Sequence, residues 1–273
     1  MRLAERVERA ILAGNPATLA GRAKLKTAIR ARRLLVRLGD PTVRYRVGAA
    51  ELELPLSHEL PFYQRDHPQY DRQLGAIAAE LGGPVVDVGA NVGDSAAAIR
   101  AESEVPILCV EGDATFFALL ERNARALGGI ELERALVEGP ARGRIQSGAG
   151  TARIVEGDDA LPSKPLAQIL DEHPAFSRPA LIKLDTDGMD VPILLANLPL
   201  LEKLRPVLFF EYDPHLGAAP AIFERLNEIG YATAGWYENT GEHVATLELP
   251  AHLHDEYVGH GGARYADICV RPR

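Results

Sequence analysis

Two glycines and two acidic residues between residues 85 and 111 form the part of the sequence best suited to bind a ligand. The run VVDVGANVGDSAAAI places Gly89 and Gly93 between an apolar strand and a helix. In doubly wound sheets, ligands bind at the carboxyl ends of the strands, where glycine allows a tight turn and a close approach. The G-x-x-x-G spacing is not the G-x-G-x-x-G of dinucleotide-binding folds, and no Gly-Lys-Ser/Thr of a phosphate-binding loop follows. A purely structural turn is the alternative interpretation.

The charges of the two acidic residues indicate which ligand this turn would accept. Asp87 lies in the strand just before the loop, where a carboxylate would repel a pyrophosphate and attract a cation. Glu111 ends the next strand, PILCVEGD, and an acidic residue at that position accepts hydrogen bonds from a ribose diol. A ligand that combines an ammonium group, a sulfonium and a ribose satisfies both residues. The sequence therefore predicts a site for S-adenosylmethionine.

Four motifs resemble those of known methyltransferases. VVDVGANVGDSA followed by CVEGD is similar to the Class I S-adenosylmethionine-dependent methyltransferases. LIKLDTDGMDVPIL followed by RPVLFFEYDPH resembles the FkbM family, whose fourth strand carries Lys-x-Asp-x-Glu-Gly-x-Glu and whose fifth strand ends in Glu. The resemblance covers residues 51–270. The chain departs from the family pattern at Asp187 and Asp190, which replace two glutamates, and at 165–167, where Pro-Leu-Ala replaces Thr-Leu-Asp.

The resemblance implies an O-methyltransferase that acts on a hydroxyl of a small molecule, such as a sugar or another hydroxylated secondary metabolite. It implies that the turn surrounds the methionine part of the cofactor, that Glu111 holds the ribose, and that Asp185 lies where cofactor and substrate meet. The full set of expected cofactor residues is Asp87, Gly89, Ala90, Asn91, Gly93, Asp94, Ser95, Glu111, Gly112, Asp113 and Asp185.

The base that removes the hydroxyl proton is expected among Asp187, Glu211 and His58. Asp187 and Glu211 end neighbouring strands, and two nearby carboxylates raise one pKa towards a useful value. His58 lies in a lead-in segment that could cover the cofactor, and His67 and His215 are weaker candidates.

Two further interpretations of the polar and aromatic residues remain open. A divalent cation held by Asp187, Glu211 and Asp213 is the less favoured reading of the carboxylates. Tyr63, Tyr70 and Trp236 could form a sugar platform or belong to the core, and no metal ligand set is assigned.

Short apolar runs alternate with helical stretches from residue 80 onward, which predicts an α/β domain. We expect a doubly wound, mostly parallel seven-stranded sheet, Rossmann-like, over 80–273, ending in an antiparallel strand after a Gly-rich link. IELERALVEG is expected to be one strand, followed by a polar region, and VPILLANLPLLEKL one helix. Residues 1–79 are expected to form an extension with a helix over 18–38, a hairpin over 42–55, and a loop leading into a helix over 69–81.

The amino-acid composition argues against some classes of function. The 273 residues are 47% hydrophobic and 25% charged, with a net charge of −8, which argues against an overall nucleic-acid binder. The two cysteines and the lack of an apolar run long enough to span a bilayer favour a cytoplasmic protein.

Charge is nevertheless uneven along the chain. Residues 1–50 hold twelve Lys or Arg against three Asp or Glu, a net of +9, so the remainder carries −17. The helix over 18–38 is thus either a solvated basic face or a contact for an anionic surface. The alternative functions are an RNA or protein methyltransferase that docks through this helix, and a non-catalytic scaffold in a biosynthetic complex. A homo-oligomer is also considered.

Overall fold

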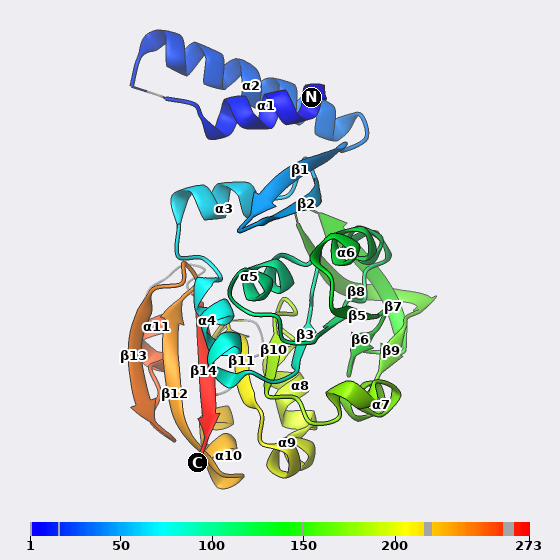
Figure 1. The fold of residues 1–273 in the computed structure, drawn as a ribbon, viewed down its shortest axis with the longest axis vertical. Coiled ribbons are helices and arrows are strands. Elements are labelled where there is room, and N and C mark those ends of the chain that lie inside the picture. Colours follow the sequence, from blue (N-terminus) through cyan, green and yellow to red (C-terminus); the bar gives the residue numbers. More distant parts are fainter. Residues whose placement is uncertain (1, 16, 149, 216–219, 259–264) are drawn as a thin grey trace.

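A large, mostly parallel β-sheet forms the centre of the protein (Figure 1). The computed structural model describes residues 2–15, 17–148, 150–215, 220–258 and 265–273. The strand order is β13-β12-β14-β11-β10-β3-β4-β5, and neighbouring strands from β5 to β11 are parallel. The strands are β3 (Val85–Val88), β4 (Ile107–Val110), β5 (Ile130–Glu133), β10 (Leu181–Leu184), β11 (Val207–Tyr212), β12 (Tyr231–Glu238), β13 (His243–Glu248) and β14 (Ala266–Pro272).

The doubly wound α/β architecture predicted from the sequence is confirmed, with one strand more than the seven expected. β14 is antiparallel to both β11 and β12, as expected for the final strand. The additional strand, β13, pairs with the outer side of β12. β13 is largely exposed and contains no hydrophobic run that would indicate a strand. The Gly-rich link predicted before the last strand lies at 259–264, outside the described residues.

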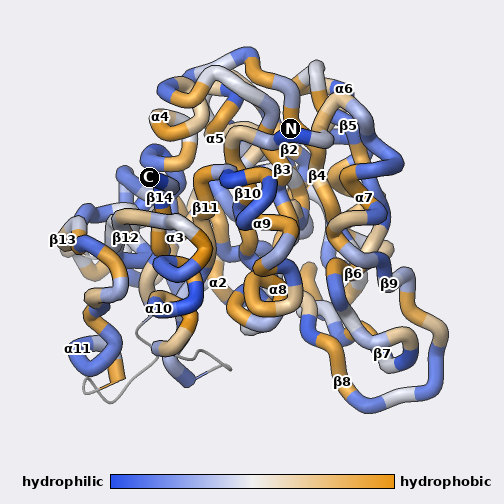
Figure 2. The backbone as a smooth tube through the Cα atoms, turned by 90° about the horizontal axis from the view of Figure 1, so that it is seen from below, coloured by the Kyte–Doolittle hydropathy of each residue, from blue (hydrophilic) through white to orange (hydrophobic). Residues whose placement is uncertain are grey.

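Helices cover both faces of the sheet because the strands are apolar on both sides. Val86 and Val88 point to one face, and Val85 to the other, as the twofold period of a strand requires. Figure 2 shows hydrophobic residues along β4 and β11 in the middle of the molecule. One face packs against α4 (Arg72–Leu81), α5 (Asp94–Glu102) and α6 (Ala114–Leu127), and the other against α7 (Leu166–Glu172), α8 (Asp190–Ala196), α9 (Leu198–Leu204) and α10 (Ala221–Glu228).

Two local expectations are wrong, and one region without a predicted element forms a hairpin. The single helix expected over VPILLANLPLLEKL is two, α8 and α9, because Pro199 has no N–H and cannot continue a helix. The single strand expected over IELERALVEG is divided between β5 and the short β6 (Leu136–Val137), which pairs with β9 (Ser163–Lys164). The polar region, for which the sequence predicts no element, forms an antiparallel hairpin of β7 (Arg142–Gly148) and β8 (Thr151–Ala160).

The N-terminal extension contains a helical pair and a β-hairpin. α2 (Leu19–Arg37) and the hairpin of β1 (Thr42–Val47) and β2 (Ala50–Pro55) confirm two of its predicted elements. The helix expected over 69–81 is α4, which begins at Arg72. Two helices were not predicted: α1 (Leu3–Leu12), which packs against α2, and α3 (Leu60–Asp66), which lies in the expected loop. The short helix α11 (His254–Val258) was also not predicted.

Arg32 connects α2 to the segment between the hairpin and α3. Its guanidinium donates hydrogen bonds to the carbonyl oxygens of Leu56, at 3.0 Å, and His58, at 3.4 Å. It also pairs with a carboxylate oxygen of Glu59 at 3.1 Å and lies 4.8 Å from the centre of the Phe62 ring. The helical pair is therefore attached to backbone that, as shown below, lines the candidate site.

Asn123 of α6 attaches the β1–β2 hairpin to the helical layer that covers the central sheet. Its side-chain oxygen accepts from the backbone N–H of Glu53 at 2.8 Å, and its amide donates to the carbonyl oxygens of Glu53 and Val92, at 3.0 and 2.8 Å. The residue is buried, so losing it leaves three backbone groups unsatisfied.

We expect Asn123→Ala to lower the free energy of unfolding by about 2–3 kcal/mol. Chemical denaturation measures this change, with Glu121→Ala on the exposed side of the same helix, α6, as the control. A change below about 0.5 kcal/mol, which is the usual size for surface substitutions, would contradict the anchoring role.

Candidate active site

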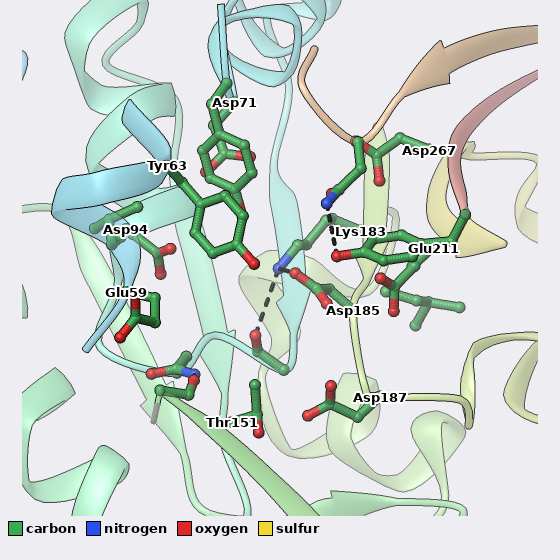
Figure 3. Close-up of a pocket in the computed structure, with 18 of the residues that line it drawn as sticks. Glu59, Tyr63, Asp71, Asp94, Thr151, Lys183, Asp185, Asp187, Glu211 and Asp267 are labelled. Atoms are coloured by element: carbon green, nitrogen blue, oxygen red, sulfur yellow. Dashed lines mark hydrogen bonds and ion pairs between the residues drawn. The ribbon is translucent and has the colours of Figure 1, made fainter. Parts of the chain in front are cut away.

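Two adjoining cavities lie at the carboxyl ends of the parallel strands. The larger has a volume of about 760 Å³ and extends along the loops after β3, β4 and β10. The smaller, about 160 Å³, lies between α3, α4 and the ends of β10, β11 and β14 (Figure 3). Four residues line both cavities: Gly89, Asn91, Asp185 and Asp187. A ligand in the larger cavity would therefore meet a second ligand at these four residues.

The loop after β3 packs directly on the end of β10. Gly89 has a φ of +77°, and a Cβ there would lie 1.8 Å from the carbonyl oxygen of Asp185. Its N–H donates to the carbonyl oxygen of Val110 at 2.9 Å, which fixes the loop on the neighbouring strand. No side chain fits at this position. The glycine predicted from the motif is therefore required by both backbone conformation and space.

Glu111 is buried at the edge of the larger cavity and holds two loops in place. One carboxylate oxygen accepts from the backbone N–H of Asn91 at 2.8 Å, and the other from the N–H of Asp113 at 2.7 Å. Burial raises the pKa of Glu111 to about 7, while these two hydrogen bonds oppose the shift. Each carboxylate oxygen keeps a second acceptor position. Glu111 can therefore accept further hydrogen bonds from a group in the larger cavity.

Asp87 is not exposed to a ligand, which amends the charge argument. Its side chain is fully buried, and one of its carboxylate oxygens lies 3.1 Å from the Lys183 ammonium. The two residues are neighbours in the sheet register of β3 and β10. Lys183 also lies 3.3 Å from Asp185. The cation that Asp87 attracts in this structure is thus Lys183, and Asp87 lines neither cavity.

Carboxylates dominate the smaller cavity. Glu211 and Asp267 are opposite each other in the antiparallel register of β11 and β14. Among the residues that the structure describes, Lys183 is the one Lys or Arg that lines the cavity. Burial, then the charge of Asp185, raise the pKa of Glu211 to about 10 and that of Asp267 to about 8. Burial alone would lower the pKa of Lys183, but Asp185 and Asp87 raise it well above its usual value. This shift favours the protonated form of Glu211 at neutral pH.

Asp187 stands where the two cavities meet. Its backbone has a φ of +51°, a conformation that costs energy for a residue with a side chain and that is frequent at functional sites. Burial, then the charge of Asp185, raise the pKa of Asp187. Nearby Asp190 does not reach the cavities. One of its carboxylate oxygens accepts from the N–H and the hydroxyl of Thr186, so it fixes this loop.

His58 lines the smaller cavity but its ring nitrogens already have partners. Nδ1 accepts from the backbone N–H of Leu60 at 3.2 Å, which leaves the proton on Nε2, 3.4 Å from the side-chain oxygen of Asn91. A histidine in this tautomer has no free lone pair to accept a substrate proton. The arrangement favours a positioning role for His58 rather than that of a base.

The aromatic candidates divide between the cavity and the core. Tyr63 and Tyr70 stack with ring centres 5.7 Å apart, and both line the smaller cavity. Trp236 is fully buried against Tyr212 and Phe223. It is a core residue, so the suggestion that it forms a sugar platform is wrong.

The remaining predicted residues are partly at the cavities. Gly112, Asp113 and His215 line the larger cavity and Asp94 the smaller. Asp113 also caps α6 by accepting from the N–H groups of Thr115 and Phe116. Five other predicted residues line neither cavity: Ala90, Gly93, Ser95, His67 and Asp213. Within the described ranges, no three His, Cys, Asp or Glu side chains are grouped to hold a metal ion.

Sequence reasoning missed several residues of the smaller cavity. These are Asp71, Lys183, Asn239, Tyr265 and Asp267. Lys183 could have been found, because the twofold period of β10 puts it on the same face as Asp185. Asp71 and Tyr265 come from loops, where no periodicity indicates the direction of a side chain.

Comparison with solved structures agrees with this fold. The METTL16 methyltransferase domain matches with a TM-score of 0.50 at 11% identity, over 96% of this chain and 87% of that one. A putative transferase from Pyrococcus horikoshii matches at 0.47 and 11%, over 99% and 100%. P. horikoshii TYW2 in complex with MeSAdo matches at 0.46 and 9%, over 89% and 82%. No protein-family model and no curated protein matches the chain. The fold is that of Rossmann-like methyltransferases.

Proposed function

We propose that this protein is an S-adenosylmethionine-dependent O-methyltransferase related to the FkbM family, acting on a hydroxyl of a small molecule such as a sugar. The observation that carries the proposal is the pair of adjoining cavities, which share Gly89, Asn91, Asp185 and Asp187. Methyl transfer needs two ligands in contact at one point. One cavity suits the cofactor and the other suits the acceptor.

The residues of the larger cavity fit the cofactor. Glu111 offers carboxylate oxygens for the ribose diol, and the apolar side chains of Leu136, Val137 and Ile154 suit the adenine. Gly112 leaves no space for a side chain, since a Cβ would lie 2.2 Å from Leu136. The loop of Gly89 and Asn91 then faces the methionine part. When bound, the cofactor supplies a methyl group on a positively charged sulfur.

The acceptor hydroxyl would lose its proton to a carboxylate at the junction of the cavities. Asp187 is the better base, because Glu211, with a pKa of about 10, is protonated at neutral pH and would donate a hydrogen bond to the acceptor instead. Tyr63 and Tyr70 provide a stacked wall for a sugar ring. A positioned base contributes about 10²–10⁴-fold to the rate.

The acidic lining also limits the charge of the acceptor. Five carboxyl groups line this cavity: Asp71, Asp94, Asp185, Glu211 and Asp267. Lys183, which is already paired with Asp87 and Asp185, is the one Lys or Arg among the described lining residues. A phosphorylated acceptor or a nucleic-acid backbone would therefore find no unpaired cation there. This supports a neutral or positively charged acceptor over RNA. The preference for a small hydroxylated molecule therefore rests on the cavity itself as well as on the family resemblance.

Calorimetry with S-adenosylmethionine and its demethylated product tests the cofactor assignment. We expect micromolar binding of both and none of NADH, and methyl transfer to a panel of sugars and other hydroxylated metabolites. Binding of NADH in their place would refute the proposal. Cofactor binding without transfer to any hydroxyl would favour a scaffold.

Glu111→Gln should weaken cofactor binding by about 10- to 100-fold. A carboxylate that accepts from the diol contributes about 1.5–3 kcal/mol per charged hydrogen bond, and the amide retains one acceptor oxygen. Isothermal calorimetry of the demethylated product measures the loss. Glu121→Gln, on the exposed side of α6, is the control and should bind as the unaltered protein does. Equal affinity for both variants would remove Glu111 from the ribose site.

A further inference from the structure

α2 exposes a continuous basic face that the proposed reaction does not use. Lys26, Arg30, Arg33 and Arg37 follow one another at spacings of three and four residues, so they share one side of the helix, and all four are exposed. The helix sequence, LAGRAKLKTAIRARRLLVR, contains no acidic residue that could neutralise this face along the helix.

Exposed leucines lie beside these cations. Leu34 is 57% exposed and Leu38, one turn further on, 75% exposed, while Leu19 at the start of the helix is 82% exposed. A single exposed leucine is ordinary on a protein surface. A pair next to a row of arginines is the composition of helices that lie in the interface of a membrane, with the cations at the headgroups and the leucines below them.

The packing of the helical pair directs this face away from the rest of the protein. Ala28 on the opposite side of α2 packs against Val7 and Ile11 of α1, and Arg32 holds the segment before α3. Figure 1 shows the two helices standing apart from the sheet at one end of the molecule. β14 runs away from that end and is antiparallel to β11, so the carboxyl ends of the parallel strands point towards the helical pair.

We propose that this face of α2 docks on an anionic lipid surface. Charge complementarity selects an anionic partner, since residues 1–50 carry +9 while the remainder of the chain carries −17. The leucines select lipid over RNA, because a phosphate backbone gains nothing from them and α2 has no aromatic side chain to stack on bases. Docking in this way places the carboxyl ends of the parallel strands, where both cavities lie, at the lipid-facing end of the molecule.

Co-sedimentation of the full chain with vesicles tests the proposal. The experiment measures no turnover, so its result is independent of the proposed function. We expect binding to phosphatidylcholine vesicles that contain phosphatidylglycerol, weakening as salt is added, and little binding to phosphatidylcholine alone. Each basic residue near an anionic surface is worth about fivefold in binding. The triple variant R30E/R33E/R37E should therefore bind about a hundredfold less or weaker still.

Two further variants separate lipid docking from general charge attraction. L34S/L38S keeps the charge and should lower vesicle binding by about tenfold. R125E/R134E/R178E changes the same charge at exposed positions outside α2 and should bind nearly as the unaltered chain does. Circular dichroism in the near ultraviolet confirms that each variant keeps its tertiary packing.

Several results would overturn the inference. These are absence of binding to the anionic vesicles, equal losses in the control and the α2 triple variant, and insensitivity to L34S/L38S. Salt-dependent RNA binding that survives L34S/L38S, without vesicle binding, would assign the face to nucleic acid. A dimer in light scattering that R30E/R33E/R37E dissociates, again without vesicle binding, would assign it to a second copy of the chain.

Discussion

Replacing Lys183 by methionine is expected to lower the free energy of unfolding by about 3–5 kcal/mol. The substitution keeps an unbranched side chain of similar length, so the loss comes from charge. It leaves the fully buried Asp87 carboxylate without the ammonium that lies 3.1 Å away. Removing one partner of a buried ion pair is costly because the other charge stays out of water. Urea unfolding followed by circular dichroism measures the difference.

The dependence on pH and a double variant identify the cause of this loss. Burial already raises the pKa of Asp87, and without Lys183 that pKa must rise further above its unfolded value. A raised carboxyl pKa gives stability that is present at low pH and is lost as pH rises. K183M should therefore be least destabilised near pH 4 and most above pH 7.

The double variant K183M/D87N should recover much of the stability at neutral pH, because no buried charge remains. A loss of equal size at every pH, or no recovery in the double variant, would show that packing rather than charge is responsible. Asp87→Ala alone leaves Lys183 paired with Asp185, 3.3 Å away. Its effect on cofactor binding would therefore be indirect, through the end of β10.

Gly89→Ala should abolish measurable cofactor binding and lower the melting temperature strongly. A Cβ at this position would lie 1.8 Å from the backbone carbonyl oxygen of Asp185, so the loop after β3 must separate from β10. Residues of these two segments line both cavities. The left-handed backbone adds about 1–2 kcal/mol of its own.

Gly82→Ala is the matched control for this prediction. Gly82 has a similar φ of +63°, but an added Cβ there meets nothing within 4 Å. It should therefore cost only the backbone strain, about 1–2 kcal/mol, and leave cofactor binding unchanged. Calorimetry and thermal unfolding of both variants separate the two contributions. If the two variants behave alike, the close contact of Gly89 with Asp185 does not determine the site.

Periodicity explains which parts of this protein could be predicted. The buried strand β4 is a continuous apolar run, and β3 and β11 are apolar apart from one carboxylate each. The β1–β2 hairpin alternates on both sides of Gly48, so all of these elements are predictable. The β7–β8 hairpin is largely exposed and has no apolar alternation to reveal it. α3 was missed because its first turn contains Pro61, which reads as a loop signal although proline is also favoured there.

The candidate site was predictable where a motif fixes the backbone and not where it depends on pairing across the sheet. Gly89 and Glu111 are placed by the strand-loop-helix sequence around them. The partner of Asp87 is set by the register of β3 with β10, nearly a hundred residues further along the chain, and Asp267 meets Glu211 only because β14 inserts beside β11. One sequence contains no signal for such registers.

The guanidinium of Arg32 has an energetic consequence for the whole molecule. It is bonded to the backbone at Leu56 and His58, and residues 58–60 line the smaller cavity. Any shift of α2 must therefore deform the smaller cavity or break these bonds. By thermodynamic reciprocity, a change in α2 that alters the affinity of this cavity for a ligand implies that the ligand alters the energetics of α2 by the same free energy.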